Sequence, residues 1–304
     1  MSRTRHCVVL LAIAGHDGWR LGRCQADHNL AVGAANALRT GGLQGGLLVG
    51  NETLRFAAAA IRGLIAEKSL RHMRHPAPTQ LQIFGERCSG TNFVAQLLRR
   101  NLPCLRLTDR YGWKHGFARR IEDGAPECAF VIVSRDPVDW VRSLHRKPWH
   151  AGNSLHDRTL PDFLREPWWC EWGRDMELAA GDPRMGTEMM HERDPVTGER
   201  FANVMRLRSS KLRDWQALQA RVRHHVAVRY EDVLAQPKAF VLDASRRLGL
   251  RRWPWYRAVK TFKGGAERFV RKEYEDMASD DREWVVTQLD ADVERAAGYS
   301  LGPA

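Results

Sequence analysis

From residue 80 onward, short apolar runs of strand length alternate with longer stretches of helical spacing. LQIF (81–84) and AFVIVS (129–134) predict buried strands, and HHVAVRYEDV contains a third at 225–229. The run at 129–134 is apolar throughout, which is typical of a parallel strand that is covered on both faces. These runs predict a sheet of parallel strands.

Five stretches have the apolar spacing or the start signals of helices: 92–100, 138–146, 203–219, 239–250 and 281–299. The second has the clearest start, because Asp136 can cap the helix and Pro137 suits its first position. Strands that alternate with helices in this way predict an α/β fold with a parallel sheet, flanking helices and right-handed crossovers.

Two parts of the chain depart from this alternation. Residues 1–75 are rich in Gly and Ala and end in a possible helix, NETLRFAAAAIRGLIAEKSL, followed by the linker RHMRHPAP. Because Met73 precedes the first strand closely, we expect 1–75 to be a dispensable N-terminal extension of the α/β domain at 76–304. Residues 147–200 are rich in Trp, Gly and Pro, which predicts a Trp-rich insertion of loops and short helices.

Charge and cysteine content narrow the class of protein. The chain has 48 Lys and Arg against 36 Asp and Glu, a net charge of +12. This favours an anionic partner such as a nucleotide, a nucleic acid, a membrane surface or an acidic polymer, although a solvated basic surface explains it equally well. The six cysteines include no C-x-x-C pair, which argues against a zinc site and fits reduced thiols. No apolar run approaches the length of a membrane helix, so we expect a cytoplasmic protein.

A glycine-rich turn, GERCSGTNF (85–93), connects the first predicted strand to the first predicted helix. Backbone N–H groups and the helix dipole converge in such a turn and favour a phosphate. Gly85 and Gly90 keep the spacing of G-x-x-x-x-G-K-[ST], but Thr91 and Asn92 replace the residues that bind the β/γ-phosphates and Mg²⁺. The turn therefore predicts a less charged phosphate held without metal; a plain tight turn is the alternative.

The stretch SRDPVDWVRS predicts a second anion site. Arg135 leaves its strand at the carboxyl edge of the sheet, where ligands of open α/β folds bind. Ser143 follows about two turns into the next helix, whose side chains tilt back toward its N-terminus. A guanidinium and a hydroxyl so placed can grip one phosphate. Taken singly, Arg135 equally fits a salt bridge and Ser143 a helix surface.

Three motifs together resemble the sulfotransferases that use 3′-phosphoadenosine 5′-phosphosulfate (PAPS) as donor. GERCSGTNF resembles the loop that holds the 5′-phosphosulfate, and SRDPVDWVRS resembles the Arg and Ser motif for the 3′-phosphate. VRYEDVLAQPKAF resembles a Y-E-D stretch common in that superfamily, and in it we expect Glu231 to brace the sheet edge. The resemblance spans residues 80–300 and implies a P-loop-type domain and a metal-free sulfuryl transfer to a hydroxyl.

The resemblance also implies catalytic residues. GWKHGF (112–117) is similar to a Lys-His stretch in which the histidine is the catalytic base. His115 is therefore the expected base, and Lys114 the expected cation for the bridging or leaving oxygens. His145 and His150 are rival bases, since they flank the same region.

One position departs from the family pattern. Many sulfotransferases have a lysine just before S-G-T, where this chain has Cys88, so Arg87 or Lys114 would supply the missing charge. We interpret Cys88 as a small neutral filler, and KTFKGGAERF as the counterpart of the family's loop over the 3′-phosphate. The expected cofactor-binding residues are Gly85, Arg87, Cys88, Ser89, Gly90, Thr91, Asn92, Arg135, Ser143, Lys263 and Gly264, and the expected catalytic residues are His115, Lys114 and Arg87.

The acceptor and two rival functions stay open at this point. Tryptophans and arginines of the insertion could hold a carbohydrate, an aryl group or an anionic acceptor, or the tryptophans could form a local core. A nucleotide-dependent kinase or NTPase is disfavoured by the missing lysine and the missing magnesium ligand. A non-catalytic binder of acidic polymer or nucleic acid explains the charge but not the ordered motifs, so we expect no nucleic-acid partner.

Overall fold

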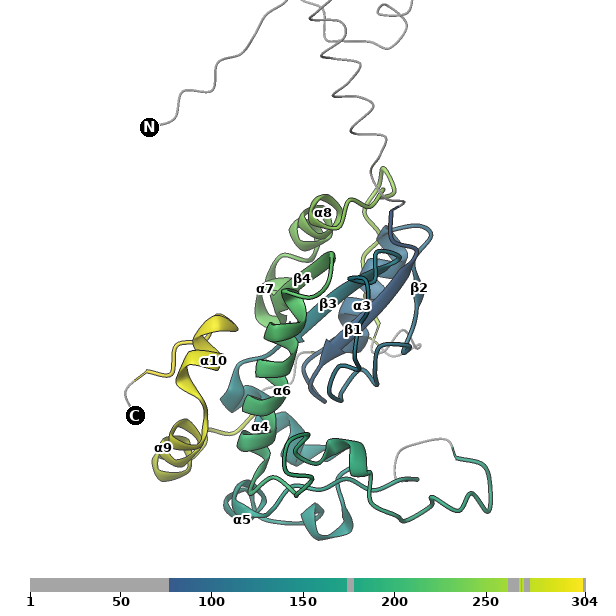
Figure 1. The fold of residues 1–304 in the computed structure, drawn as a ribbon. Helices are drawn as coiled ribbons and strands as arrows, with labels where there is room; N and C mark the ends of the chain where they lie inside the picture. Colours follow the sequence, from purple (N-terminus) through teal and green to yellow (C-terminus); the bar gives the residue numbers. More distant parts are fainter. Residues whose placement is uncertain (1–76, 174–177, 262–267, 269, 271–273, 303–304) are drawn as a thin grey trace, which may run out of the picture. The chain divides into compact units, whose positions relative to one another are not determined.

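The computed structural model describes residues 77–173, 178–261, 268, 270 and 274–302. Within them, four parallel strands form one sheet in the order β2-β1-β3-β4 (Figure 1). Their bounds are β1 Gln80–Gly85, β2 Arg106–Leu107, β3 Cys128–Ser134 and β4 His224–Arg229. The predicted α/β fold with a parallel sheet and flanking helices is confirmed. The two-residue β2 is exposed and lacks an apolar run, so the pattern did not predict it. The predicted extension over 1–75 lies outside the described residues.

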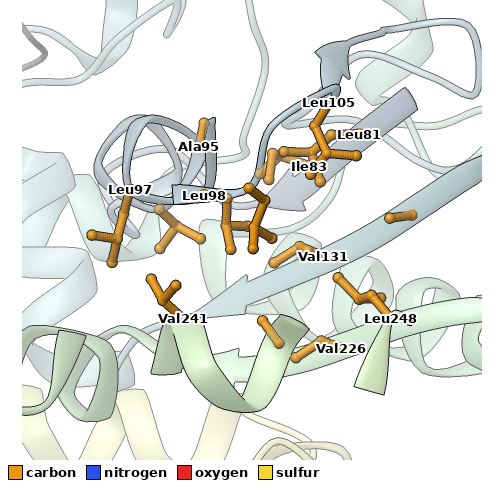
Figure 2. Close-up of a cluster of buried hydrophobic side chains, with 14 of the residues drawn as sticks. Leu81, Ile83, Ala95, Leu97, Leu98, Leu105, Val131, Val226, Val241 and Leu248 are labelled. Atoms are coloured by element: carbon orange, nitrogen blue, oxygen red, sulfur yellow. The ribbon is translucent and has the colours of Figure 1, made fainter. Parts of the chain in front are cut away.

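One face of the sheet packs against α3 (Thr91–Asn101) and α8 (Pro237–Arg247). Alternate side chains of the strands point to this face because successive residues of a strand point in opposite directions. Figure 2 shows this buried cluster, which contains Leu98 of α3, Val131 of β3 and Val241 of α8. The continuous apolar run of β3 thus supplies a core on each side of the sheet.

The opposite face packs against α6 (Val204–Gln219) and α10 (Ala291–Ala296). Phe130 of β3 lies in this second core with Trp215 of α6 and Val293 of α10. Helices therefore cover both faces of the sheet, as the predicted parallel arrangement requires.

A third buried cluster lies among α4, α5, α9, the first two turns of α6 and the segment between α5 and α6. Helices α4 and α5 lie below the sheet in Figure 1. Trp168 belongs to this cluster and is almost fully buried. The Trp-rich segment therefore forms a local core around short helices, as one of the two sequence interpretations expected. The Trp-rich segment contains η1 Asn153–Leu155, α5 Leu160–Arg165 and η2 Met190–Glu192, and it packs with α4 Pro137–Arg146 and α9 Ser279–Gln288.

Capping residues set several helix boundaries. The carboxylate of Asp136 accepts hydrogen bonds from the N–H groups of Val138 and Asp139, both at 3.0 Å, which confirms the predicted start of α4. The helical stretch predicted at 281–299 is divided into α9 and α10. Asp290 causes the division, because its carboxylate caps α10 by accepting from the N–H of Val293 at 3.1 Å.

Candidate functional site

The carboxyl edge of the sheet brings the predicted motifs together. The register of the sheet pairs Gly85, the last residue of β1, with Val133 of β3. The glycine loop, defined here as residues 85–92, therefore leaves β1 beside the point where Arg135 follows β3. Tyr230 follows β4 at the same edge and begins α7 (Tyr230–Ala235). Open α/β sheets bind their ligands at this edge.

Two glycines fix the path of the glycine loop. A Cβ on Gly85 would lie 2.5 Å from the carbonyl oxygen of Val133, so β3 leaves no room for a side chain. Gly90 has a φ of 86°, in the left-handed region, and a Cβ there would lie 2.2 Å from the ring of Tyr230. Gly90 is also the N-cap of α3 and has no side chain with which to cap that first turn. The N–H groups at the first turn of a helix are donors suited to an anion.

The hydroxyl residues of the glycine loop stabilise its own fold. The Ser89 hydroxyl is fully buried and donates to the carbonyl oxygen of Glu86 at 2.6 Å. Thr91 is also buried, with its methyl group against Gly85. Asn92 is exposed, and its side-chain oxygen accepts from the Lys114 ammonium at 2.8 Å. An anion in this loop would thus meet backbone N–H groups and Lys114, with Ser89 acting behind them.

Arg135 connects the glycine loop to the second motif. Its Nη1 donates to the carbonyl oxygen of Cys88 at 3.0 Å. Cys88 has a φ of 61°, unusual for a residue other than glycine, and its thiol lies 3.7 Å from the backbone oxygen of Ser143. The loop and α4 are therefore in contact at Cys88, and both predicted anion sites share Arg135 as a neighbour.

Two tyrosines that the sequence did not single out as ligands flank Arg135. The guanidinium lies 5.3 Å from the ring centroid of Tyr230 and 5.7 Å from that of Tyr274. The Tyr274 hydroxyl donates to the Ser143 hydroxyl oxygen at 2.9 Å. The structure therefore places Arg135 and Ser143 beside one tyrosine, and Arg135 beside the loop.

His115 lies at the base of the glycine loop. The N–H of Gly85 donates to the Lys114 carbonyl at 3.0 Å, and His115 Nδ1 donates to the Gly85 carbonyl at 2.6 Å. A carbonyl can only accept, so Nδ1 carries the proton and, in the neutral ring, Nε2 carries the lone pair. Burial first, and then the charges of Arg87 and Lys114, hold the pKa of His115 well below its usual value. The ring is therefore neutral at physiological pH and can accept a proton at Nε2.

The rival bases differ in their surroundings. His145 is directed elsewhere, because its Nε2 lies 2.8 Å from the carbonyl oxygen of Arg158. His150 lies with its ring centroid 5.6 Å from that of Trp113, which also contacts His115 at 5.3 Å. His191, which the sequence analysis did not consider, packs on Trp113 at 5.6 Å as well. Three imidazoles thus surround one indole beside the glycine loop.

The Arg87 side chain belongs to a buried ionic cluster. Its guanidinium is buried and bonds the Glu192 carboxylate at 2.5 and 3.1 Å and the Cys170 sulfur at 3.1 Å. Lys211 pairs with the same carboxylate. Burial alone would raise the pKa of Glu192, but Arg87 and Lys211 outweigh burial and hold it well below its usual range. The structure thus brings Arg87 into a buried ionic cluster, whereas the sequence predicted a contact with the transferring group.

A second buried ionic cluster braces the glycine loop from behind. Arg208 is fully buried, and its guanidinium bonds Glu86 at 2.6 Å and Glu294 of α10 at 2.6 and 2.8 Å. Nη2 also donates to the carbonyl oxygen of Arg135 at 2.9 Å. One guanidinium balances only one of the two carboxylates, and burial raises the pKa of Glu86 to about 7. A single side chain thus ties the loop, the end of β3 and α10 together.

The sequence held one signal for these clusters. Arg208 and Lys211 fall at helical spacing among Val204, Leu207 and Leu212 of α6, on the face that the pattern assigns to the core. A buried cation needs a buried anion. The pattern could therefore have indicated charged pairs under α6, but not which carboxylates complete them.

Arginines of the Trp-rich segment are paired with carboxylates. Arg158 lies 3.7 Å from Glu166, and Arg165 lies 2.8 Å from Asp281. Glu188 pairs with both Arg193 and Arg200. The hydrogen bonds from these two arginines, together with their charges, outweigh burial and lower the pKa of Glu188 to about 2. These guanidiniums are therefore balanced within the protein, which the sequence could not show.

Some predicted features lie elsewhere. Lys263 and Gly264 fall outside the described residues. The Glu231 carboxylate accepts from the N–H of Asp136 at 2.8 Å and from the Tyr299 hydroxyl at 2.9 Å, which fits the bracing role that we expect for it. A cavity of about 600 Å³ beside β4 is lined by none of the predicted site residues.

Clusters of metal-ligating residues and membrane-spanning helices are absent from the described part of the chain. In residues 77–302, apart from the gaps given above, His, Cys, Asp and Glu form no group of three or more suited to a metal ion. Over the same residues, no helix has both the length and the apolar composition needed to span a bilayer.

Comparison with known proteins adds no assignment. Neither a scan against protein-family models nor a search of curated proteins finds a match for this chain.

Proposed function

We propose that this chain is a PAPS-dependent sulfotransferase acting on a hydroxyl. The observation that carries the proposal is the position of Arg135 between the two candidate phosphate sites. Its Nη1 contacts the Cys88 carbonyl of the glycine loop, and its guanidinium lies over Tyr274, whose hydroxyl bonds Ser143. A donor with phosphates at its 5′ and 3′ ends needs two anion sites that lie close together at one edge of the sheet. The three motifs in family order support the same conclusion.

The residues at this edge of the sheet have the chemistry needed to bind PAPS as a substrate. The first turn of α3 and the Lys114 ammonium would hold the 5′-phosphosulfate, and Arg135 with Ser143 would hold the 3′-phosphate. PAPS carries its sulfuryl group on the 5′-phosphate, which is a good leaving group. Charge stabilisation by Lys114 and by the loop N–H groups would offset the negative charge that grows on the 5′-phosphate.

His115 is the base in this proposal. The acceptor oxygen forms its bond to sulfur as the bond from sulfur to the 5′-phosphate breaks, and the acceptor proton moves to His115 Nε2. The hydrogen bond from Nδ1 to the Gly85 carbonyl supports this role, because it orients the ring and leaves Nε2 as the acceptor. The imidazolium that forms would be stabilised by the same carbonyl.

Two sequence-based assignments change within the proposal. Arg87 is assigned to the buried cluster with Glu192, so Lys114 alone supplies the charge that a loop lysine supplies in many sulfotransferases. The paired arginines of the Trp-rich segment favour an acceptor without charge, a sugar or a small metabolite hydroxyl. Trp113, with His115, His150 and His191 around it, is the surface on which such an acceptor would pack.

Calorimetric binding of adenosine 3′,5′-bisphosphate to the full chain tests the proposal. We expect it to bind more tightly than ATP with Mg²⁺, and Arg135→Ala to weaken it about tenfold to a hundredfold through loss of charged hydrogen bonds. Arg106→Ala, an exposed arginine on β2, is the matched control and should change nothing. Tighter binding and hydrolysis of ATP would instead favour a kinase or NTPase. Retention on DNA without nucleotide binding would favour a polymer binder.

A further inference from the structure

The backbone of residues 274–275 is hydrogen-bonded to α4 next to Ser143. Arg142, the residue before Ser143, donates through Nη2 to the Tyr274 carbonyl at 2.6 Å and to the Glu275 carbonyl. The Arg142 guanidinium also lies 5.6 Å from the centroid of the Tyr274 ring. The backbone and the ring of Tyr274 are thus both held by α4, so its hydroxyl has a defined position.

The hydrogen bond between Tyr274 and Ser143 limits the directions in which the serine proton can point. A serine hydroxyl has one proton and two lone pairs, and a phenol has one proton to donate. The Tyr274 hydroxyl donates its proton to the Ser143 oxygen at 2.9 Å and so occupies one of the serine lone pairs. A phenol is a stronger acid than an aliphatic alcohol and so is the better donor of the two. With the phenol as donor, the proton of Ser143 points away from the phenol oxygen. Ser143 therefore accepts one hydrogen bond and can donate another to a third group, an arrangement in which hydrogen bonds strengthen one another.

Arg135 defines where that third group would lie. Its guanidinium lies over the same ring, 5.7 Å from the centroid, so Arg135 and Ser143 approach Tyr274 together. We propose that Tyr274 is a positioning residue for the 3′-phosphate: it orients the Ser143 hydroxyl so that its proton points to an anion held by Arg135. This inference rests on the proposed function and extends it, because it makes Tyr274 a determinant of selectivity for adenosine nucleotides that carry a 3′-phosphate.

A tyrosine that competes with the phosphate would give a different result in a binding measurement. If the phenol instead filled the place of the phosphate, an incoming nucleotide would have to displace it from Ser143. Its removal would then tighten binding. Measurement with the conservative variant Tyr274→Phe separates the two roles, because Phe keeps the ring that packs on Arg135 and Arg142 and removes only the hydroxyl.

The experiment compares wild type, Tyr274→Phe, Ser143→Ala and the double variant by calorimetry. The probes are adenosine 3′,5′-bisphosphate and AMP, which lacks the 3′-phosphate. We expect Tyr274→Phe to weaken bisphosphate binding about threefold to tenfold and to leave AMP binding unchanged. In the Ser143→Ala background the same change should have no further effect, because the tyrosine acts through the serine hydroxyl. Tyr256→Phe, a half-buried tyrosine that packs against the α3–α8 core, is the matched control.

The outcomes separate the inference from the proposed function. Wild type that binds both nucleotides equally, or neither, removes the 3′-phosphate site and with it the proposed function. Wild type that prefers the bisphosphate, while Tyr274→Phe binds as well as or better than wild type, overturns only the role of Tyr274. Additive losses in the double variant would also overturn it. Should Tyr274→Phe unfold, Arg142→Gln tests the same point, because it removes the hydrogen bonds that hold residues 274–275 against α4 and so frees the phenol from its position. Bisphosphate binding should then weaken while AMP binding stays unchanged, and unchanged bisphosphate binding would overturn the role of Tyr274.

Discussion

The buried carboxylate of Glu86 makes a quantitative prediction about stability. Arg208 lies between Glu86 and Glu294, and one guanidinium cannot balance both charges. Burial raises the pKa of Glu86 from the ordinary 4.5 to about 7, and one of its oxygens has no hydrogen-bond partner within the described residues. The perturbation is Glu86→Gln, which removes the charge and keeps an oxygen that can accept from Arg208.

The size of the change in unfolding free energy follows from the linkage between proton binding and folding. A raised pKa means that the folded state binds this proton more tightly than the unfolded state does. The stability it contributes is complete below 4.5 and is lost as the pH rises through about 7. At about 1.4 kcal/mol for each pH unit, the wild type should lose roughly 3 kcal/mol of unfolding free energy across this window relative to Glu86→Gln.

Urea unfolding of the full chain, followed by the fluorescence of buried tryptophans, measures this difference. The gain from Glu86→Gln should be small near pH 5 and should increase by roughly 3 kcal/mol by about pH 8. Glu122→Gln, at an exposed carboxylate, is the control and should give a flat difference. A difference for Glu86→Gln that varies by less than about 1 kcal/mol over the same range would show that Arg208 keeps Glu86 ionised, which refutes the reasoning.

Three further predictions concern the glycine loop and its surroundings. Gly90→Ala should weaken adenosine 3′,5′-bisphosphate binding more than tenfold in calorimetry, because a Cβ would meet the Tyr230 ring at 2.2 Å. Gly249→Ala is its control: Gly249 also has a left-handed backbone, but a Cβ there meets open space, so this variant shows the backbone strain of about 1–2 kcal/mol without a clash. His115→Ala should lower turnover about a hundredfold or more with little change in donor affinity, and the acid limb of the wild-type kcat profile should lie below the usual histidine pKa; an acid limb near 6.5 would contradict the pKa assignment. Glu192→Gln should cost about 3–5 kcal/mol in urea unfolding, because it leaves two buried cations without their anion; a loss below about 1 kcal/mol would mean that the cluster is not ionised.

The order of strands and helices was predictable because its causes are local. The apolar run of β3 and the capping carboxylate of Asp136 act within a few residues of themselves, and both fixed element boundaries to within one residue. The same local logic failed at Asp290, where an acidic residue inside a helical pattern is a cap that starts a new helix. It also missed β2, whose two residues are exposed and are strand only because β1 pairs with them.

The candidate site also has one part that the sequence predicts and one part that only the structure shows. The positions of the glycine loop and of Arg135 at one sheet edge follow from parallel strand order, which the sequence predicts. The direction of each side chain does not. Arg87 and Cys88 are adjacent, yet Arg87 turns into the core toward Glu192, 105 residues away, while Cys88 contacts α4.

What the sequence by itself determined is a parallel α/β sheet with a glycine-rich turn and an arginine at its carboxyl edge. Periodicity, capping chemistry and glycine conformation specify these features, and each acts over one or two turns of the chain. What only the tertiary structure decided is the pairing of charged and hydroxyl groups: Arg208 with Glu86 and Glu294, and Tyr274 with Ser143 across 131 residues. A buried cation needs a partner, and a half-buried hydroxyl favours one, but packing alone selects which one.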